Sequence, residues 1–138
     1  MSDLNQLYSE IIMEHYENSP HRRELKEATL KERGHNPLCG DDITIYLKIN
    51  GDVIEDASFT GHGCAISQAS TSMMIDLIKG KDKKEALRLV QKFIDMIHKK
   101  DVDLEELGDA QVLQGVSDFP ARVKCALLAW KTLQDTLK

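Results

Sequence analysis

The sequence predicts an α+β fold in which one small antiparallel sheet packs against helices. Between residues 43 and 48, apolar and polar side chains alternate with the period of a half-buried strand. The pair Asn50-Gly51 follows, and it favours a tight hairpin because both residues tolerate positive φ. From residue 65 onward the apolar residues recur at helical spacing. Helices around a single antiparallel sheet make this an α+β protein.

The N-terminal segment predicts a helix that stops at Asn18-Ser19-Pro20, since proline cannot continue a helix. Ser2 or Asp3 is available as its N-cap. Its apolar residues at helical spacing are Leu4, Leu7, Tyr8, Ile11 and Ile12. Residues 21–38 are polar and irregular, with a short third strand expected near residues 28–30.

The rest of the chain predicts a hairpin followed by helices. Residues 53–59 supply the returning strand, and Gly61-His62-Gly63-Cys64 then breaks it. We expect helices over 65–79, 84–99 and 104–107, and a last one with Pro120 in its first turn. Proline is tolerated there because its missing N–H would have no partner in the helix.

Length, charge and cysteine count limit the function. The 138 residues suffice for a single domain over 1–138 with one modest core. A net charge of −5 argues against nucleic acid as a partner. We expect a cytoplasmic protein without a membrane partner, because the chain shows neither a long apolar run nor a signal peptide. Three cysteines without an export signal indicate metal binding or redox chemistry rather than disulfides.

The cysteines are predicted to approach one another. Cys39 lies in a loop shaped by proline and glycine, and Asp41 follows two residues later. Cys64 ends the hairpin, so the hairpin should bring these three residues to one edge of the sheet. Cys125 lies on the last helix, away from its main apolar stripe. Three thiolates and a carboxylate suit zinc, but without a C-x-x-C pair the spacing alone favours buried structural cysteines.

The motifs around the cysteines resemble those of the IscU/SufU family of iron–sulfur cluster assembly proteins over nearly the whole chain. They are Asn36-Pro37-Leu38-Cys39-Gly40-Asp41, Gly-His-Gly-Cys-Ala-Ile-Ser-Gln-Ala-Ser at 61–70, and a third cysteine on the final helix. The resemblance implies an IscU/SufU-like α+β domain with zinc held by Cys39, Asp41, Cys64 and Cys125.

Three departures from IscU resemble SufU. Lys124 stands where IscU has a histidine, the stretch 119–124 differs from the chaperone-recognition sequence of IscU, and the interval between Cys64 and Cys125 is longer. SufU-like function implies a zinc-dependent sulfurtransferase. Cys39 would take sulfur from a cysteine desulfurase that uses pyridoxal phosphate, once docking has freed it from the zinc. The sulfur would then pass to a downstream iron–sulfur scaffold or acceptor protein.

Other functions remain open on the same residues. A scaffold that carries a transient [2Fe–2S] cluster would use the same thiolates. A zinc hydrolase or deaminase is disfavoured because no H-x-E or P-C-x-x-C pairing is present, and a plain interaction module would leave the cysteines idle. Arg122 could contact a thiolate or serve as an ordinary surface arginine. The histidines His15, His21, His62 and His98 are expected to be solvated.

Overall fold

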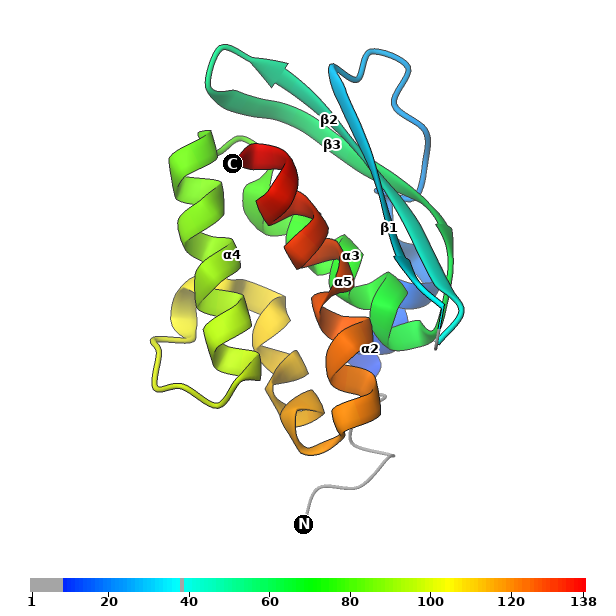
Figure 1. Cartoon of the computed structure of the whole chain (residues 1–138), viewed down its shortest axis with the longest axis vertical. Helices are drawn as coiled ribbons and strands as arrows, with labels where there is room; N and C mark the ends of the chain where they lie inside the picture. The colour runs from blue at the N-terminus through cyan, green and yellow to red at the C-terminus, as the bar shows by residue number, and fades with distance from the viewer. Residues whose placement is uncertain (1–8, 38) are drawn as a thin grey trace.

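A computed structural model describes residues 9–37 and 39–138. In these residues the predicted α+β class is confirmed, with a three-stranded antiparallel sheet of order β1-β2-β3 packed with helices (Figure 1). The elements in chain order are α2 (Glu10–Asn18), β1 (Leu30–Asn36), β2 (Asp41–Asn50), β3 (Val53–His62), α3 (Ala65–Ile78), α4 (Lys83–Ile97), the 3₁₀ segment η1 (Glu105–Asp118) and α5 (Pro120–Leu137).

The central strand β2 directs its apolar side chains toward the helices. Ile43, Ile45 and Leu47 are buried, and α5 packs against β1 and β2 while α3 packs against β3. Because side chains alternate along a strand, Asp41 lies on this inner face with them and Asp42 lies on the outer face. The first residue of β2 therefore carries a carboxylate into the interior, at the end of the sheet where β1 finishes.

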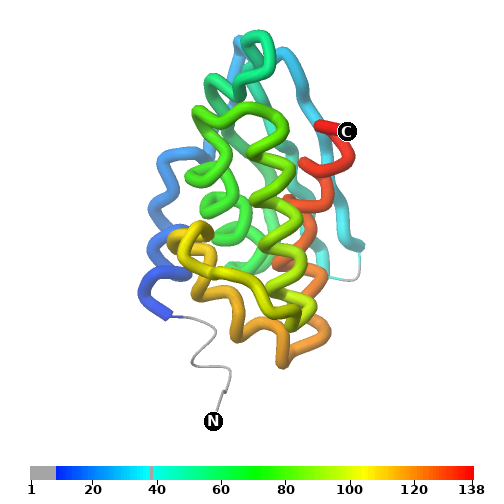
Figure 2. Tube along the Cα trace, turned by 90° about the vertical axis from the view of Figure 1, so that its left-hand side faces the viewer, coloured from blue at the N-terminus to red at the C-terminus, as the bar shows by residue number. Residues whose placement is uncertain are grey.

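The helices form two layers on one side of the sheet. In Figure 1, α3 and α5 lie next to the strands and α4 lies beyond them; Figure 2 shows α4 in front and the strands behind. The layers meet at a stacked aromatic pair, Phe93 of α4 and Trp130 of α5, whose ring centroids are 3.8 Å apart. Both rings are fully buried, so burial of apolar area joins α4 to the layer that touches the sheet.

The N-terminal helix differs from its prediction at its start. It begins at Glu10, because Ser9 is in an extended conformation and its hydroxyl accepts a hydrogen bond from Ile12 N at 3.5 Å. The expected caps Ser2 and Asp3 lie outside the described residues. The helix ends at Asn18 as predicted, and Ile12 is buried in the core.

Two other elements are longer than predicted. The third strand, β1, has seven residues and starts at Leu30, whereas the sequence suggested only 28–30. It is an edge strand whose outer side chains are polar and exposed, so it lacks the apolar alternation that identifies β2. The segment expected at 104–107 continues as η1, kinked at Gly108, where φ is 53°.

Two histidines expected in solvent are instead partly buried between elements. The His15 ring bonds to Ser72 of α3 and to Asp109 of η1, at 2.9 and 3.0 Å. His21 is 9% exposed and bonds to Asp76 of α3. These contacts join α2 and the following turn to α3. No helix in residues 9–37 and 39–138 has the length and apolar character needed to cross a membrane.

Candidate metal centre

The connection between β1 and β2 positions the first two predicted ligands. Cys39 N donates to Asn36 O at 3.3 Å, which closes a turn, and Gly40 has a φ of 70° that glycine adopts without strain. Asp41 pairs with Asn36 in the sheet. This short connection places Cys39 and Asp41 at the same end of the sheet.

Cys64 is the N-cap of α3, two residues after the end of β3. Its sulfur accepts a hydrogen bond from Ser67 N at 3.4 Å, and its own N–H donates to Asp41 Oδ1 at 3.0 Å. The structure thus brings Asp41 and Cys64 together as the hairpin geometry predicts. The contact also joins the start of β2 to the start of α3.

Cys125 reaches the same place from the second turn of α5. It is 1% exposed, since α5 packs against β1, α3 and α4 and is buried on more than one face. Its sulfur lies 3.7 Å from Ala121 O, and the sulfur of Cys39 lies 3.8 Å from the same oxygen. Cys125, which lies away from the main apolar stripe of α5, is therefore buried against the connection between β1 and β2.

Three of the four predicted ligands form a compact group. The ligand atoms of Cys39, Asp41 and Cys125 lie within 4.8 Å of one another. Cys64 is not part of that group, but its sulfur accepts a hydrogen bond from the Cys125 thiol. This bond lowers the pKa of Cys64 to about 6 and raises the pKa of Cys125. The hydrogen bond thus favours the thiolate form of Cys64.

The buried carboxylate of Asp41 fits a bound cation. Asp41 is 0% exposed, and its Oδ2 has no hydrogen-bond partner among the described residues. An unpaired carboxylate oxygen is costly to bury, and a cation beside it would offset that cost. Thiolate and carboxylate donors together suit zinc or another soft divalent ion. The donor set therefore fits a metal.

Two neighbours of the group shape it without donating a side-chain ligand. Gly63 leaves room for the carboxylate, because a Cβ built on it would lie 2.5 Å from Asp41 Oδ1. Ser67 supplies the N–H that bonds to the sulfur of Cys64. The sequence analysis missed both roles. The only signals were the two glycines before Cys64 and the small side chains after it.

The other residues named from the sequence lie outside the 4.8 Å group. His62 is exposed at the end of β3, as predicted for it, and it pairs in the sheet with Asp42. Asp42 points outward as the alternation requires, and its hydrogen bonds from Arg33 hold the pKa of its carboxyl below the usual value. Arg122 is half-buried at the start of α5, and Lys124 is exposed.

The chain is similar to a known protein family and to individual known proteins. The model of the family described as NifU-like N terminal domain matches residues 7–126. The zinc-dependent sulfurtransferase SufU of Bacillus subtilis is 47% identical, over 96% of this chain and 90% of that protein. The iron–sulfur cluster assembly scaffold protein IscU of Thermotoga maritima is 41% identical, over 96% and 93%.

A solved structure supports the same relationship. The crystal structure of FiSufU from Fervidobacterium islandicum AW-1 superposes with a TM-score of 0.93 and is 43% identical. The match covers 99% of this chain and all of that one. The IscU/SufU resemblance of the cysteine motifs is thus confirmed by similarity along almost the whole chain, and the chain belongs to the NifU-like N-terminal domain family.

Proposed function

We propose that this protein is a zinc-dependent sulfurtransferase of iron–sulfur cluster assembly, a single domain over residues 1–138 that works in the cytoplasm. It accepts persulfide sulfur from a cysteine desulfurase that uses pyridoxal phosphate. The sulfur then passes to a downstream iron–sulfur scaffold or acceptor. The 47% identity to a protein named as a zinc-dependent sulfurtransferase supports this activity.

Cys39, Asp41, Cys64 and Cys125 would hold the zinc. The buried Asp41 Oδ2, which has no hydrogen-bond partner in the described part of the chain, is the observation that carries this part of the proposal. When bound, zinc would keep the cysteines as thiolates and protect them from side reactions. Asp41 also accepts the N–H of Cys64, so it orients the start of α3 toward the same point.

Cys39 is the proposed sulfur acceptor. It is half-buried in the connection between two strands, whereas Cys125 is 1% exposed and Cys64 caps α3. Its thiolate attacks the outer sulfur of the desulfurase persulfide. The S–S bond of that persulfide then breaks, and the desulfurase cysteine leaves as a thiolate. Cys39 now carries the persulfide.

The test measures alanine formation from cysteine by the desulfurase of the same organism, with and without this protein. We expect stimulation, and mass spectrometry of the protein should place one additional sulfur atom on Cys39. Cys39→Ser should abolish both. Because that change also alters the metal site, the position of the sulfur is the decisive result. Sulfur on Cys64 or Cys125, with Cys39 unmodified, would show that the acceptor is misassigned.

A scaffold for a [2Fe–2S] cluster is the second candidate, supported by the 41% identity to a protein named as an IscU scaffold. It would use the same thiolates, since iron–sulfur clusters are held by cysteine. Supplying iron and sulfide to the reduced protein should then produce a stable visible spectrum of a [2Fe–2S] cluster. If the desulfurase is not stimulated and this spectrum forms, the scaffold function replaces the transferase.

A further inference from the structure

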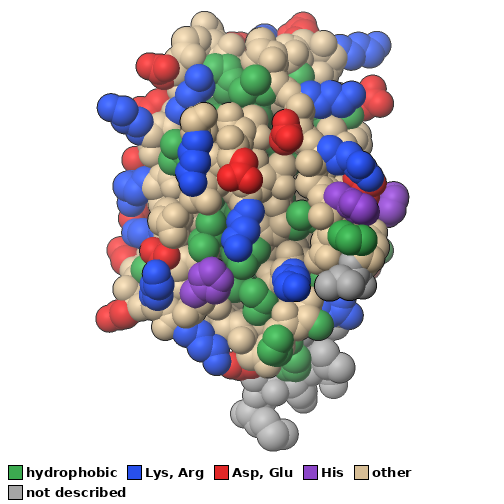
Figure 3. All heavy atoms as spheres, viewed as in Figure 1, with side chains coloured by type: hydrophobic (Ala, Val, Ile, Leu, Met, Phe, Trp, Pro, Cys, Tyr) green, Lys and Arg blue, Asp and Glu red, His purple; other side chains and the backbone are tan. Residues whose placement is uncertain are grey.

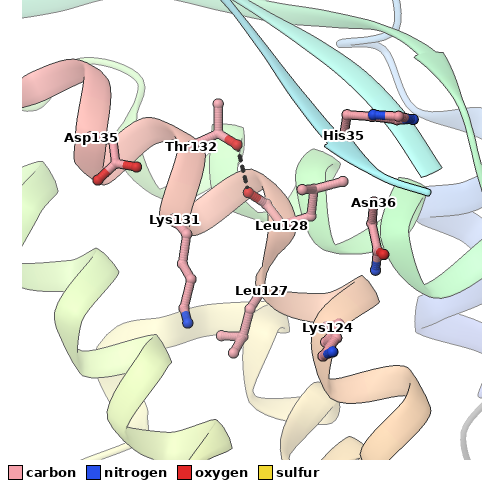
Figure 4. Close-up of a pocket in the computed structure, with 8 residues that line it drawn as sticks. All are labelled: His35, Asn36, Lys124, Leu127, Leu128, Lys131, Thr132 and Asp135. Atoms are coloured by element: carbon pink, nitrogen blue, oxygen red, sulfur yellow. Dashed lines mark hydrogen bonds between the residues drawn. The ribbon is translucent and has the colours of Figure 1, made fainter. Parts of the chain in front are cut away.

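A groove of about 250 Å³ lies beside the metal centre, between β1 and α5. Its walls come from His35 and Asn36 at the end of β1 and from the outer side of α5 (Figure 4). The β1 end leads directly into the loop that carries Cys39, and Lys124 on α5 immediately precedes Cys125. Each wall of the groove thus contains residues that lie next to a proposed ligand in sequence.

The groove is positively charged although the protein is negative overall. Lys124 and Lys131 both line it and are exposed, and their spacing of seven residues puts them on one side of α5. Neither ammonium group forms an ion pair within the described part of the chain, whereas Lys48, Lys92 and several arginines do. One acidic side chain, Asp135, also lines the groove, and of the lining residues it is the one farthest along α5 from Cys125.

Apolar side chains lie between the two lysines. Leu127 and Leu128 line the groove, and Leu128 is only half-buried. Figure 4 shows Leu127 and Lys131 extending to the same side of α5, and Figure 3 shows basic and hydrophobic side chains interspersed near the middle of this face. An occupant that matches the groove would thus combine carboxylates with apolar groups.

We propose that this groove binds an acidic, partly apolar segment of the cysteine desulfurase and so holds that partner beside Cys39. The inference rests on the proposed function, because it names how the sulfur donor is recognised. Carboxylates of the segment would pair with Lys124 and Lys131, and its apolar side chains would cover Leu128. Charge pairs at the edge of an interface mainly speed association and set its salt dependence.

Lys131→Glu is the test variant, since Lys131 is exposed and lies almost two helical turns from Cys125. The readout is the concentration of this protein that gives half-maximal stimulation of alanine formation. We expect Lys131→Glu to raise it by about tenfold, because repulsion replaces attraction, and Lys131→Gln to raise it less. The maximal rate and the bound zinc should stay unchanged. Added salt should raise the half-maximal concentration of the parent protein more than that of the variant, because salt screens the charge attraction that the variant lacks.

Lys84→Glu is the matched control. It makes the same change of charge at an exposed lysine of α4, outside the groove, and should leave half-maximal stimulation unaltered. The desulfurase does not dock in this groove if the half-maximal concentration of Lys131→Glu stays within about twofold of the parent value. The same conclusion follows if the variant impairs only transfer to a downstream acceptor. If the parent protein itself fails to stimulate, the proposed function fails and the inference with it.

Discussion

At the residue scale, the candidate site depends on how Asp41 is held. Its carboxylate is fully buried, one oxygen accepts the N–H of Cys64, and the other has no partner among the described residues. Gly63 makes room for this arrangement, because any Cβ there would collide with Asp41 and come within 3.0 Å of the hydroxyl of Ser67. The small size of Gly63 thus allows the position that Asp41, a candidate metal ligand, occupies.

Gly63→Ala should therefore weaken zinc binding although all four donor side chains remain. The added methyl group pushes Asp41 from its place, and changes around a ligand commonly lower metal affinity about 10- to 100-fold. Competition with a chromophoric chelator measures the affinity. Gly115→Ala is the control, since a Cβ there has no described heavy atom within 4 Å. Equal affinity in the parent and Gly63→Ala would show that Asp41 is not held as a ligand.

The sequence predicted the proximity of the candidate donors better than it predicted their surroundings. Cys39, Asp41 and Cys64 could be placed together because a hairpin has a known geometry, and Asp42 could be turned outward by alternation. The partners of His15 could not be predicted. Ser72 and Asp109 are 57 and 94 residues away in sequence, and no local pattern marks such contacts.

At the scale of elements, a buried hydrogen-bond chain joins the two helices that carry Cys64 and Cys125. The Ser70 hydroxyl of α3 donates to Ala126 O at 2.7 Å and accepts from Trp130 Nε1 at 2.7 Å, both on α5. All three groups are fully buried. Since Ala126 follows Cys125 directly, this chain fixes the depth and rotation of α5 against α3 close to the site.

Ser70→Ala should lower the free energy of unfolding by about 1–3 kcal/mol, because it leaves the buried indole N–H of Trp130 without a partner. Urea unfolding followed by the fluorescence of Trp130 gives this value. Ser58→Ala is the matched change, at a serine equally buried whose hydroxyl has no partner among the described residues. If Ser70→Ala lowers the free energy of unfolding no more than Ser58→Ala does, the hydrogen bonds of Ser70 do not couple the two helices.

Elements with a strong apolar pattern were predicted closely. The helices α3 and α4 begin and end within about two residues of expectation, and α5 has Pro120 in its first turn as predicted. The strand β1 was misjudged because its stability comes from pairing with β2 and from packing of α5 on Gly34, where a Cβ would lie 2.3 Å from the hydroxyl oxygen of Thr132. Neither contact leaves a periodic signal in a polar segment.

At the scale of the whole molecule, the proposed metal would link separate parts of the fold. Cys39 and Asp41 belong to the sheet end, Cys64 to α3 and Cys125 to α5. In the described residues, Asp41 accepts a hydrogen bond from the Cys64 backbone N–H, and the Cys125 thiol donates to the sulfur of Cys64. The thiols of Cys39 and Cys125 also make weak contacts with Ala121 O. A metal on all four would add direct bonds between the sheet, α3 and α5.

Zinc should accordingly stabilise the entire fold. A ligand that binds only the folded protein, at a free concentration of 100 times its dissociation constant, adds about 2.7 kcal/mol. For a domain of this size that raises Tm by roughly 10 °C. Thermal unfolding of reduced, chelator-treated protein, followed by Trp130 fluorescence with and without zinc, measures the shift. Magnesium at the same concentration should have little effect, because it prefers oxygen donors to thiolates. A Tm that zinc leaves unchanged would mean that the four side chains do not share one ion.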